Sequence, residues 1–229
     1  GIDRPAIASL LPTRRGESVM LDLGANIECD ARNLVEFAVM GAQFARALLG
    51  RLKPTVGLLN VGSEEMKGHE ELRQAAERLR SYEDLPFTFH GFIEGDDIGA
   101  GTVDVVVTDG FTGNVALKTA EGTAKLITNY MSLALRRSWT TRLGALLALP
   151  ALRALRERLD PRQYNGGVFL GLNGITVKSH GGTDAIGFAS AIDVAVDMAR
   201  SHMVELIAED IRRFPAHLLG PTQPAVAAT

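Results

Sequence analysis

The segment VVVTDGFTGNVALKTAEG, residues 105–122, carries the strongest indication of fold class. Its three valines predict a short strand that is covered on both faces, as in a parallel sheet. The polar residues that follow lead without a spacer into a predicted helix at residues 115–125, with Asn114 as its cap. Gly110 and Gly113 allow backbone angles and close approaches that a side chain would forbid. Such a strand, turn and helix start can bind an anion, although most turns of this composition only reverse the chain.

The strand of this segment is one of four predicted strands that are each followed by a Gly-rich polar loop. Strands are predicted at residues 18–23, 55–60, 87–92 and 103–108. Between them we expect a buried helix at residues 34–49, with Asn33 as cap and Gly50 as stop, and an amphipathic helix that runs to about residue 80. Strands that alternate with helices predict a doubly wound, mostly parallel, Rossmann-like α/β sheet. Ligands bind at the carboxyl ends of such strands, where this sequence has Gly-rich polar loops.

The pattern changes after residue 125. A protruding helical hairpin is predicted at about residues 126–162, with Trp139 and arginines flanking an apolar tip. The tip contains Leu143, Leu146, Leu147 and Leu149. Residues 166–178 then predict a pair of strands, and residues 188–213 one long helix with Phe188, Ile192, Ala199, Met203 and Ile207 on one face. We expect a single domain at residues 1–214 and a loosely ordered tail at residues 215–229.

Composition excludes several classes of protein. The chain has 229 residues, of which 46% are hydrophobic and 22% charged, as in a soluble globular protein. A net charge of -3 without basic runs argues against nucleic-acid binding. Cys29 is the only cysteine, so a disulfide framework is excluded and a cytoplasmic setting is expected. No His, Asp and Glu group has metal-ligand spacing, and we expect no cofactor. The sequence begins with Gly1 rather than Met, which suggests a fragment or a processed product.

Three motifs in this order resemble one known family. LDLGANIECDARNLVEFAVMGAQFA, VGLLNVGSEEMKG and VVVTDGFTGNVALKTAEG are similar to the bacterial acyl-acyl carrier protein:phosphate acyltransferases, the PlsX family. YNGGVFLGLNG and KSHG continue the likeness to about residue 214. The resemblance implies a fold like that of phosphotransacetylase and isopropylmalate dehydrogenase. Family members also begin with an Asp-rich and Gly-rich region that is missing here, so an active centre built from this chain alone would be incomplete.

The resemblance implies an acyl transfer. Inorganic phosphate attacks the thioester of a fatty acyl carrier protein, which releases the carrier and gives acyl phosphate for phospholipid synthesis. Phosphate is already anionic, so the enzyme has to position it and stabilise the oxyanion. We assign the phosphate cradle to Gly110, Thr112, Gly113 and Asn114. Asn114 is also a candidate donor to the oxyanion, and the alternative is a plain helix cap.

The loop after the second predicted strand contributes Gly62, Glu65 and Lys67 to the candidate site. The Lys67 ammonium would neutralise the phosphate or the oxyanion, and the alternative is a solvated surface lysine. Glu64 and Glu65 would orient Lys67, or would only stabilise the start of the next helix.

Three further residues are candidates with open alternatives. Asp109 would hold a base or a backbone turn. His180 lies in a Gly-rich loop and would protonate the leaving thiol, or would make a structural hydrogen bond. Asn26, after the first predicted strand, is a weaker candidate at the rim.

The predicted partners are acyl carrier protein, inorganic phosphate, a second copy of the chain and a downstream glycerol-phosphate acyltransferase. The hairpin tip is predicted to touch the cytoplasmic membrane, or its leucines only pack against the dimer partner. Two rival functions are a nicotinamide-dependent dehydrogenase, whose G-x-G-x-x-G fingerprint is missing, and a non-catalytic phosphate-ligand or carrier-binding module.

Overall fold

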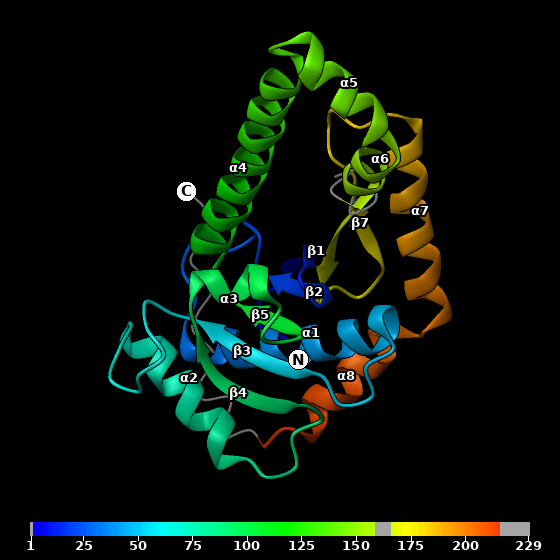
Figure 1. Cartoon of the computed structure of the whole chain (residues 1–229). Helices are drawn as coiled ribbons and strands as arrows, with labels where there is room; N and C mark the ends of the chain where they lie inside the picture. The colour runs from blue at the N-terminus through cyan, green and yellow to red at the C-terminus, as the bar shows by residue number, and fades with distance from the viewer. Residues whose placement is uncertain (1, 159–165, 216–229) are drawn as a thin grey trace, which may run out of the picture.

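The computed structural model describes residues 2–158 and 166–215 (Figure 1). Its strands form one sheet in the order β4-β3-β5-β2-β1-β6-β7. The parallel part consists of β2 (Gly16–Leu21), β5 (Val105–Val107), β3 (Thr55–Leu59) and β4 (Thr88–Ile93). All three valines of β5 are buried between β2 and β3, which confirms the strand predicted from them.

The other part of the sheet is antiparallel. β1 (Ala6–Thr13) pairs with β2 on one side and with β6 (Gly167–Leu170) on the other, and β6 pairs with β7 (Thr176–Lys178). The strand pair predicted at residues 166–178 is confirmed, whereas β1 was not predicted. The α/β fold class is therefore confirmed, with a sheet that is mixed.

Helices cover both faces of the sheet. On one face, α1 (Ala31–Leu49), α2 (Glu70–Ser81), α7 (Ala185–Arg200) and α8 (Met203–Arg213) contribute to the larger core. On the other, α3 (Gly95–Ala100) and α4 (Gly110–Arg136) pack on a smaller core. A Cβ atom on Gly41 of α1 would lie 2.6 Å from Val105 Cγ1, so this glycine lets α1 lie close against β5.

Two predicted helix caps are wrong by a few residues. Asp30 caps α1, and Asn33 is the reciprocal partner of Asp30 three residues into the helix. Asp109 caps α4, so the helix begins at Gly110, before Asn114. The predicted stop at Gly50 is confirmed, because Gly50 ends α1 with a φ of 64°.

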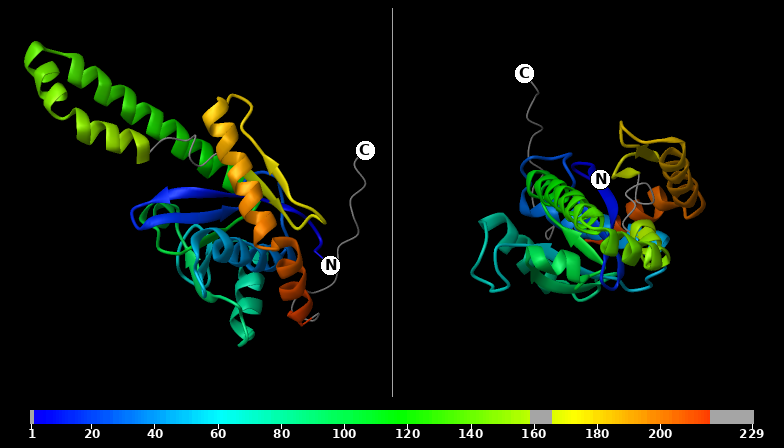
Figure 2. Two further views of the ribbon diagram at one scale, coloured as in Figure 1. Left: turned by 90° about the vertical axis from the view of Figure 1, so that its right-hand side faces the viewer. Right: turned by 45° about the horizontal axis from the view of Figure 1, so that its top comes forward.

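The predicted hairpin protrudes from the sheet (Figures 1 and 2). Its first arm is α4 itself, which has 27 residues and runs past the predicted end of its helix at residue 125. α5 (Trp139–Leu147) forms the turn, and α6 (Leu149–Arg158) returns towards the sheet. Residues 159–162 of the predicted hairpin lie outside the described residues. Within the described part of the chain, no helix is both long enough and apolar enough to cross a membrane.

The single helix predicted at residues 188–213 is wrong. The chain breaks it at Ser201 and His202, between α7 and α8, and His202 adopts a left-handed backbone with a φ of 51°. The break lets α8 pack against α1, since Met203, Ile207 and Ile211 are buried. Phe188 and Ile192 of α7 are instead exposed and do not share a buried face with them. Of the predicted tail, residues 216–229 lie outside the described residues.

Candidate active site

The candidate site lies at the edge of the sheet where three neighbouring strands end. Its loops follow β2, β5 and β3, which are adjacent parallel strands. Neighbouring strands are about 4.8 Å apart, so the loops that leave their carboxyl ends are close together. Residues of three motifs that are far apart in the sequence therefore share one edge of the sheet.

Asp22 holds the loop after β2. Its side chain is fully buried, and its Oδ1 accepts hydrogen bonds from the N–H groups of Ile7, Gly24 and Ala25 at 3.0 to 3.1 Å. Its Oδ2 accepts from the backbone and side-chain nitrogens of Asn26 at 2.7 and 2.9 Å. The charge of Asp22 is thus satisfied by donors. Sequence reasoning missed this residue, although an acidic residue directly after a buried strand was a signal.

Asn26 belongs to the same scaffold. It is buried, and its Nδ2 donates to the Pro5 carbonyl oxygen at 2.8 Å as well as to Asp22. The amide therefore joins the segment before β1 to the loop after β2. These contacts are structural, and the predicted role of Asn26 at the rim of the phosphate site stays a prediction.

Gly110 and Gly113 allow the start of α4 to lie directly on this loop. A Cβ atom on Gly110 would lie 2.5 Å from the Asn26 carbonyl oxygen, and one on Gly113 would overlap the Asp22 carbonyl oxygen. Neither glycine has a positive φ. Both are needed for close approach, and the predicted need for special backbone angles does not apply.

Three of the first four N–H groups of α4, those of Gly110, Thr112 and Gly113, already have partners. Gly110 N donates to the Asn26 carbonyl oxygen at 2.7 Å, and Gly113 N donates to the Asp109 carbonyl oxygen at 2.9 Å. The Asp109 carboxylate accepts from Thr112 N at 2.8 Å and from Thr112 Oγ1 at 2.7 Å. Two roles were expected for Asp109, to hold a base or to hold a backbone turn. These contacts hold a backbone turn. An anion at this end of α4 would therefore be held mainly by side chains.

Asn114 lies one turn inside α4 and is exposed to solvent. Its side chain lies over the loop after β2, because a Cβ atom on Gly24 would be 3.6 Å from Asn114 Cβ. Among the described residues, none forms a hydrogen bond with its side-chain amide. The alternative role of a helix cap is excluded by the position of Asp109, and the amide has donors to offer to a ligand.

Lys67 lies in the loop after β3, and its Nζ is 3.9 Å from Glu64 Oε1. Both side chains are more than half exposed, so this ion pair is weak. Glu65 forms its ion pair with Arg80 of α2 at 3.3 Å. Of the two acids that we expected to orient Lys67, only Glu64 contacts it. A Cβ atom on Gly62 would lie 2.5 Å from Glu64 Oε2 and 3.2 Å from Lys67 Cγ, so Gly62 makes room for both.

Asn60 fixes the ends of this loop and was not predicted. Its Nδ2 donates to the Lys67 carbonyl oxygen at 3.1 Å, and its Oδ1 accepts from Val61 N at 2.8 Å. Gly68 has a φ of 86°, and a Cβ atom on it would overlap the Asn60 side chain. The loop therefore closes around a nearly buried amide, which places Lys67 at the carboxyl edge.

His180 is not brought to this edge by the structure. It follows β7, which lies four positions from β5 in the sheet. Lys178 at the end of β7 pairs with Gly167, whereas Leu170 at the other end of β6 pairs with Ala6 beside Asp22. The chain thus leaves β7 towards the opposite edge. There His180 Nδ1 accepts from Gly182 N at 3.1 Å, and its predicted role as proton donor stays a prediction.

The charges at this edge act on Cys29. Burial raises the pKa of the Cys29 thiol to about 12, and the carboxylates of Asp22 and Asp109 add to the increase. The Gly110 N–H group and the Arg4 guanidinium act in the opposite direction. The thiol therefore stays protonated at neutral pH. Within residues 2–158 and 166–215, no group of three or more His, Cys, Asp or Glu side chains is arranged to hold a metal ion.

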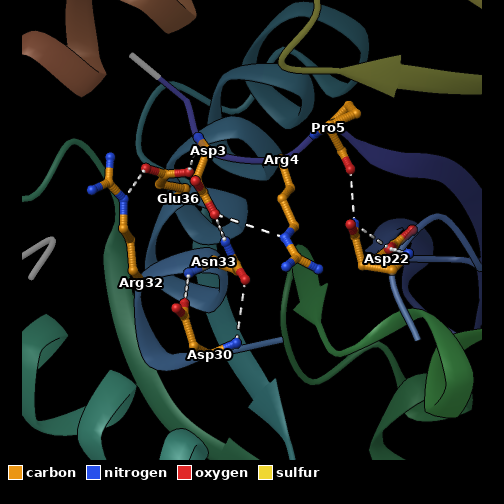
Figure 3. A network of polar contacts seen from close by, with 9 residues as sticks. Asp3, Arg4, Pro5, Asp22, Asp30, Arg32, Asn33 and Glu36 are labelled. Carbon is orange, nitrogen blue, oxygen red and sulfur yellow. Dashed lines mark hydrogen bonds and ion pairs between the residues drawn. The ribbon is translucent and has the colours of Figure 1, made fainter. Parts of the chain in front are cut away.

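A second polar network holds the segment before β1 against α1 (Figure 3). The fully buried Glu36 carboxylate accepts from Asp3 N and Arg32 Nε, each at 2.8 Å. Burial raises the pKa of Glu36, and these two donors oppose the increase. Asn33 Nδ2 donates to Asp3 Oδ2 at 3.0 Å. The residues around Arg4 are thereby fixed to the start of α1.

Known proteins resemble this chain in sequence over most of its length. Residues 1–206 match the family described as "Fatty acid synthesis protein". The chain is 62% identical over 218 residues to the phosphate acyltransferase of Rhodospirillum centenum, covering 95% of this chain and 61% of that protein. It is 59% identical over 228 residues to the phosphate acyltransferase of Xanthobacter autotrophicus, covering 100% and 62%. The chain thus spans about three fifths of the length of these relatives.

Among solved structures, the EutD phosphotransacetylase from Staphylococcus aureus is similar in fold. The TM-score is 0.50 at 17% sequence identity, and the match covers 90% of this chain and 55% of that chain. At this identity the match supports the fold class alone.

Proposed function

Because the chain belongs to the fatty acid synthesis protein family that includes the phosphate acyltransferases, we propose that its protein transfers a fatty acyl group from acyl carrier protein to inorganic phosphate. The product would be an acyl phosphate for phospholipid synthesis. The observation that supports the proposal is that the segments carrying Lys67 and Asn114 follow the adjacent parallel strands β3 and β5 at their carboxyl ends. Lys67 brings the positive charge that an anionic nucleophile requires, and Asn114 brings an amide donor for the oxyanion.

The proposed reaction needs no nucleophile from the protein. A phosphate oxygen forms a bond with the thioester carbon, and the carbonyl oxygen becomes an oxyanion. The carbonyl double bond then re-forms as the carbon–sulfur bond breaks, and the thiolate leaves with the carrier protein. The thiolate takes up a proton that balances the one lost from hydrogen phosphate. Lys67 would neutralise charge on the phosphate, and Asn114 would donate to the oxyanion. Asp22, Asn60 and the glycines Gly110 and Gly113 of α4 would hold these groups in place.

The test is acyl phosphate formation from fatty acyl-acyl carrier protein and inorganic phosphate by the full-length protein. Lys67→Ala and Asn114→Ala should each lower turnover by about 10² or more, because each removes a group that stabilises the transition state. Lys53→Ala serves as a matched control, since Lys53 is an exposed lysine before β3, at the other edge of the sheet. Near-normal turnover of both site variants would contradict the proposed roles.

The same assay separates the rival functions. A carrier-binding or phosphate-binding module would bind its ligand without forming acyl phosphate, and a nicotinamide-dependent dehydrogenase would need its cofactor to turn over. Binding without acyl phosphate formation, or turnover only with a nicotinamide cofactor, would each contradict the proposed transfer.

We also propose that the protein is a homodimer that contacts the cytoplasmic membrane peripherally. Support comes from exposed apolar residues along the protruding hairpin. At its tip, Leu143, Leu146 and Leu147 are exposed, whereas Leu149 is half-buried. A tip with basic flanks suits an anionic bilayer surface. There the acyl phosphate would pass to a downstream glycerol-phosphate acyltransferase.

A further inference from the structure

Arg4 lies in the segment that enters β1, and the backbone on each side of it is fixed. Asp3 N donates to Glu36 Oε2 at 2.8 Å, and the Pro5 carbonyl oxygen accepts from Asn26 Nδ2 at 2.8 Å. The first contact is with α1 and the second with the loop after β2. The backbone of Arg4 is therefore held between α1 and the loop after β2.

The Arg4 side chain extends from this segment towards the carboxyl edge. Figure 3 shows it between Asn33 of α1 and Asp22 after β2, with its guanidinium directed away from the backbone of residues 3–5. The electrostatics agree with this position, because both the Arg4 charge and the Gly110 N–H group lower the pKa of Cys29. The Arg4 charge and the first residue of α4 thus both act on Cys29 in the loop after β2.

The guanidinium keeps donors for a ligand. Among the described residues its ion pair is with Asp3, where Nε lies 3.8 Å from Oδ2. Asp3 Oδ2 also accepts from Asn33 Nδ2, and the Arg4 side chain is 36% exposed. The nearby carboxylates of Asp22 and Asp109 are engaged by N–H and hydroxyl donors. The two terminal nitrogens of Arg4 remain as a planar pair that matches two phosphate oxygens.

We propose that Arg4 is a phosphate-binding residue of the candidate site, alongside Lys67 and Asn114. The proposal rests on the proposed function and extends it. Gly110, Thr112 and Gly113 at the start of α4 already donate their N–H groups within the fold. Backbone N–H groups carry no net charge, so the charge that balances a phosphate dianion comes from side chains. Lys67 supplies one mobile point charge, and Arg4 supplies a fixed guanidinium that binds phosphate through two parallel hydrogen bonds.

The test compares steady-state kinetics of the full-length wild-type protein with those of Arg4→Gln and Arg4→Lys. Arg4→Gln should raise KM for inorganic phosphate about tenfold or more, because one charged ligand is lost. The KM for acyl carrier protein should change little. Arg4→Lys should recover part of the loss, since it restores the charge without the planar pair. Arg51→Gln is the matched control, because Arg51 pairs with Asp104 at 3.3 Å before β3 and β5, at the other edge.

Asp3→Asn gives a second test with a different expected direction. It removes the negative charge beside Arg4 and keeps an oxygen that accepts from Asn33, so KM for phosphate should fall or stay constant. If Arg4→Gln changes the melting temperature but leaves KM for phosphate within about twofold of wild type, Arg4 only anchors Asp3 and the proposal is overturned. If wild type forms no acyl phosphate, the proposed function fails. Calorimetric titration with inorganic phosphate then decides the role of Arg4, since equal affinities of wild type and Arg4→Gln would overturn it.

Discussion

At the scale of single residues, the geometry of the candidate site depends on how closely two backbone segments approach each other. The loop after β2 lies directly under the first turn of α4, and Gly110 and Gly113 leave the space for it. The buried Asp22 carboxylate gathers the N–H groups of that loop. A small change of volume at this contact would therefore separate the loops that carry the proposed phosphate ligands.

Gly113→Ala should destabilise the fold by about 3 kcal/mol or more, because its Cβ atom would overlap the Asp22 carbonyl oxygen and backbone has to move. Gly122→Ala is the control in the same helix. A Cβ atom at Gly122 meets no other atom within 4 Å, so this change should stabilise the protein by about 0.5 to 1 kcal/mol through helix propensity. Urea unfolding of both variants is the measurement, and equal midpoints would contradict the proposed contact.

Cys29 offers a test of the buried charges. The raised pKa, about 12 against an ordinary 9.0, leaves about a thousandfold less thiolate than in the unfolded chain at pH 8. Labelling by a thiolate-specific disulfide reagent should therefore be slow in native protein and fast in urea. Because the folded-state pKa is the higher one, the contribution of this thiol to stability is complete below pH 9 and is lost as the pH rises towards 12. Rapid stoichiometric labelling of native protein at pH 8 would argue against this environment.

The sequence predicted some site residues and missed others for one physical reason. Lys67 and Asn114 stand in motifs whose local pattern of strand, glycines and helix start indicates a ligand edge. Asp22 accepts a hydrogen bond from Ile7 of β1, and the segment that carries Arg4 is held by Glu36 and Asn26. These contacts join segments that no local sequence pattern places together.

At the scale of elements, local patterns predicted the type of an element better than its ends. The buried run of β5 and the stop of α1 at Gly50 were read from a few residues. The caps were misplaced because Asp and Asn near a helix start are equally good caps, and tertiary contacts select one of them. β1 was missed since half of its pairing is with the distant β6. The break at His202 follows from the packing of α8 on α1, which no periodicity in residues 188–213 reveals.

The hairpin tip should bind anionic liposomes in a flotation assay with the full-length protein. The Leu146→Glu and Leu147→Glu double variant should remain in the soluble fraction, because it places two carboxylates on the apolar face of the tip. Added salt should weaken binding of the wild type. Leu52→Glu is the control, since Leu52 is 90% exposed in the loop before β3. Equal flotation of the double variant and wild type would show that these leucines do not contact the bilayer.

At the scale of the whole molecule, apolar surface is left uncovered along α4. Leu126, Ile127, Tyr130 and Leu133 are each at least half exposed and lie on one face of the helix. Exposed apolar faces of this length usually mark an interface. A second copy paired by two-fold symmetry is the commonest solution.

Sedimentation at micromolar concentration should show a dimer of the full-length protein. Ile127→Glu should shift the equilibrium towards monomer, because it places a charge within the proposed interface. Thr128→Glu is the control on the other face of α4, where Thr128 Oγ1 donates to the Ala124 carbonyl oxygen within its own helix. A wild-type monomer, or an unchanged dimer of Ile127→Glu, would contradict dimerisation through α4.

α4 is a single continuous helix from the candidate phosphate site to the base of the tip. At 1.5 Å per residue, its 27 residues give a rigid strut of about 40 Å. A surface touched by the tip would therefore stand about the length of this strut away from the start of α4. Any product released at the candidate site would have to travel that distance to reach the surface.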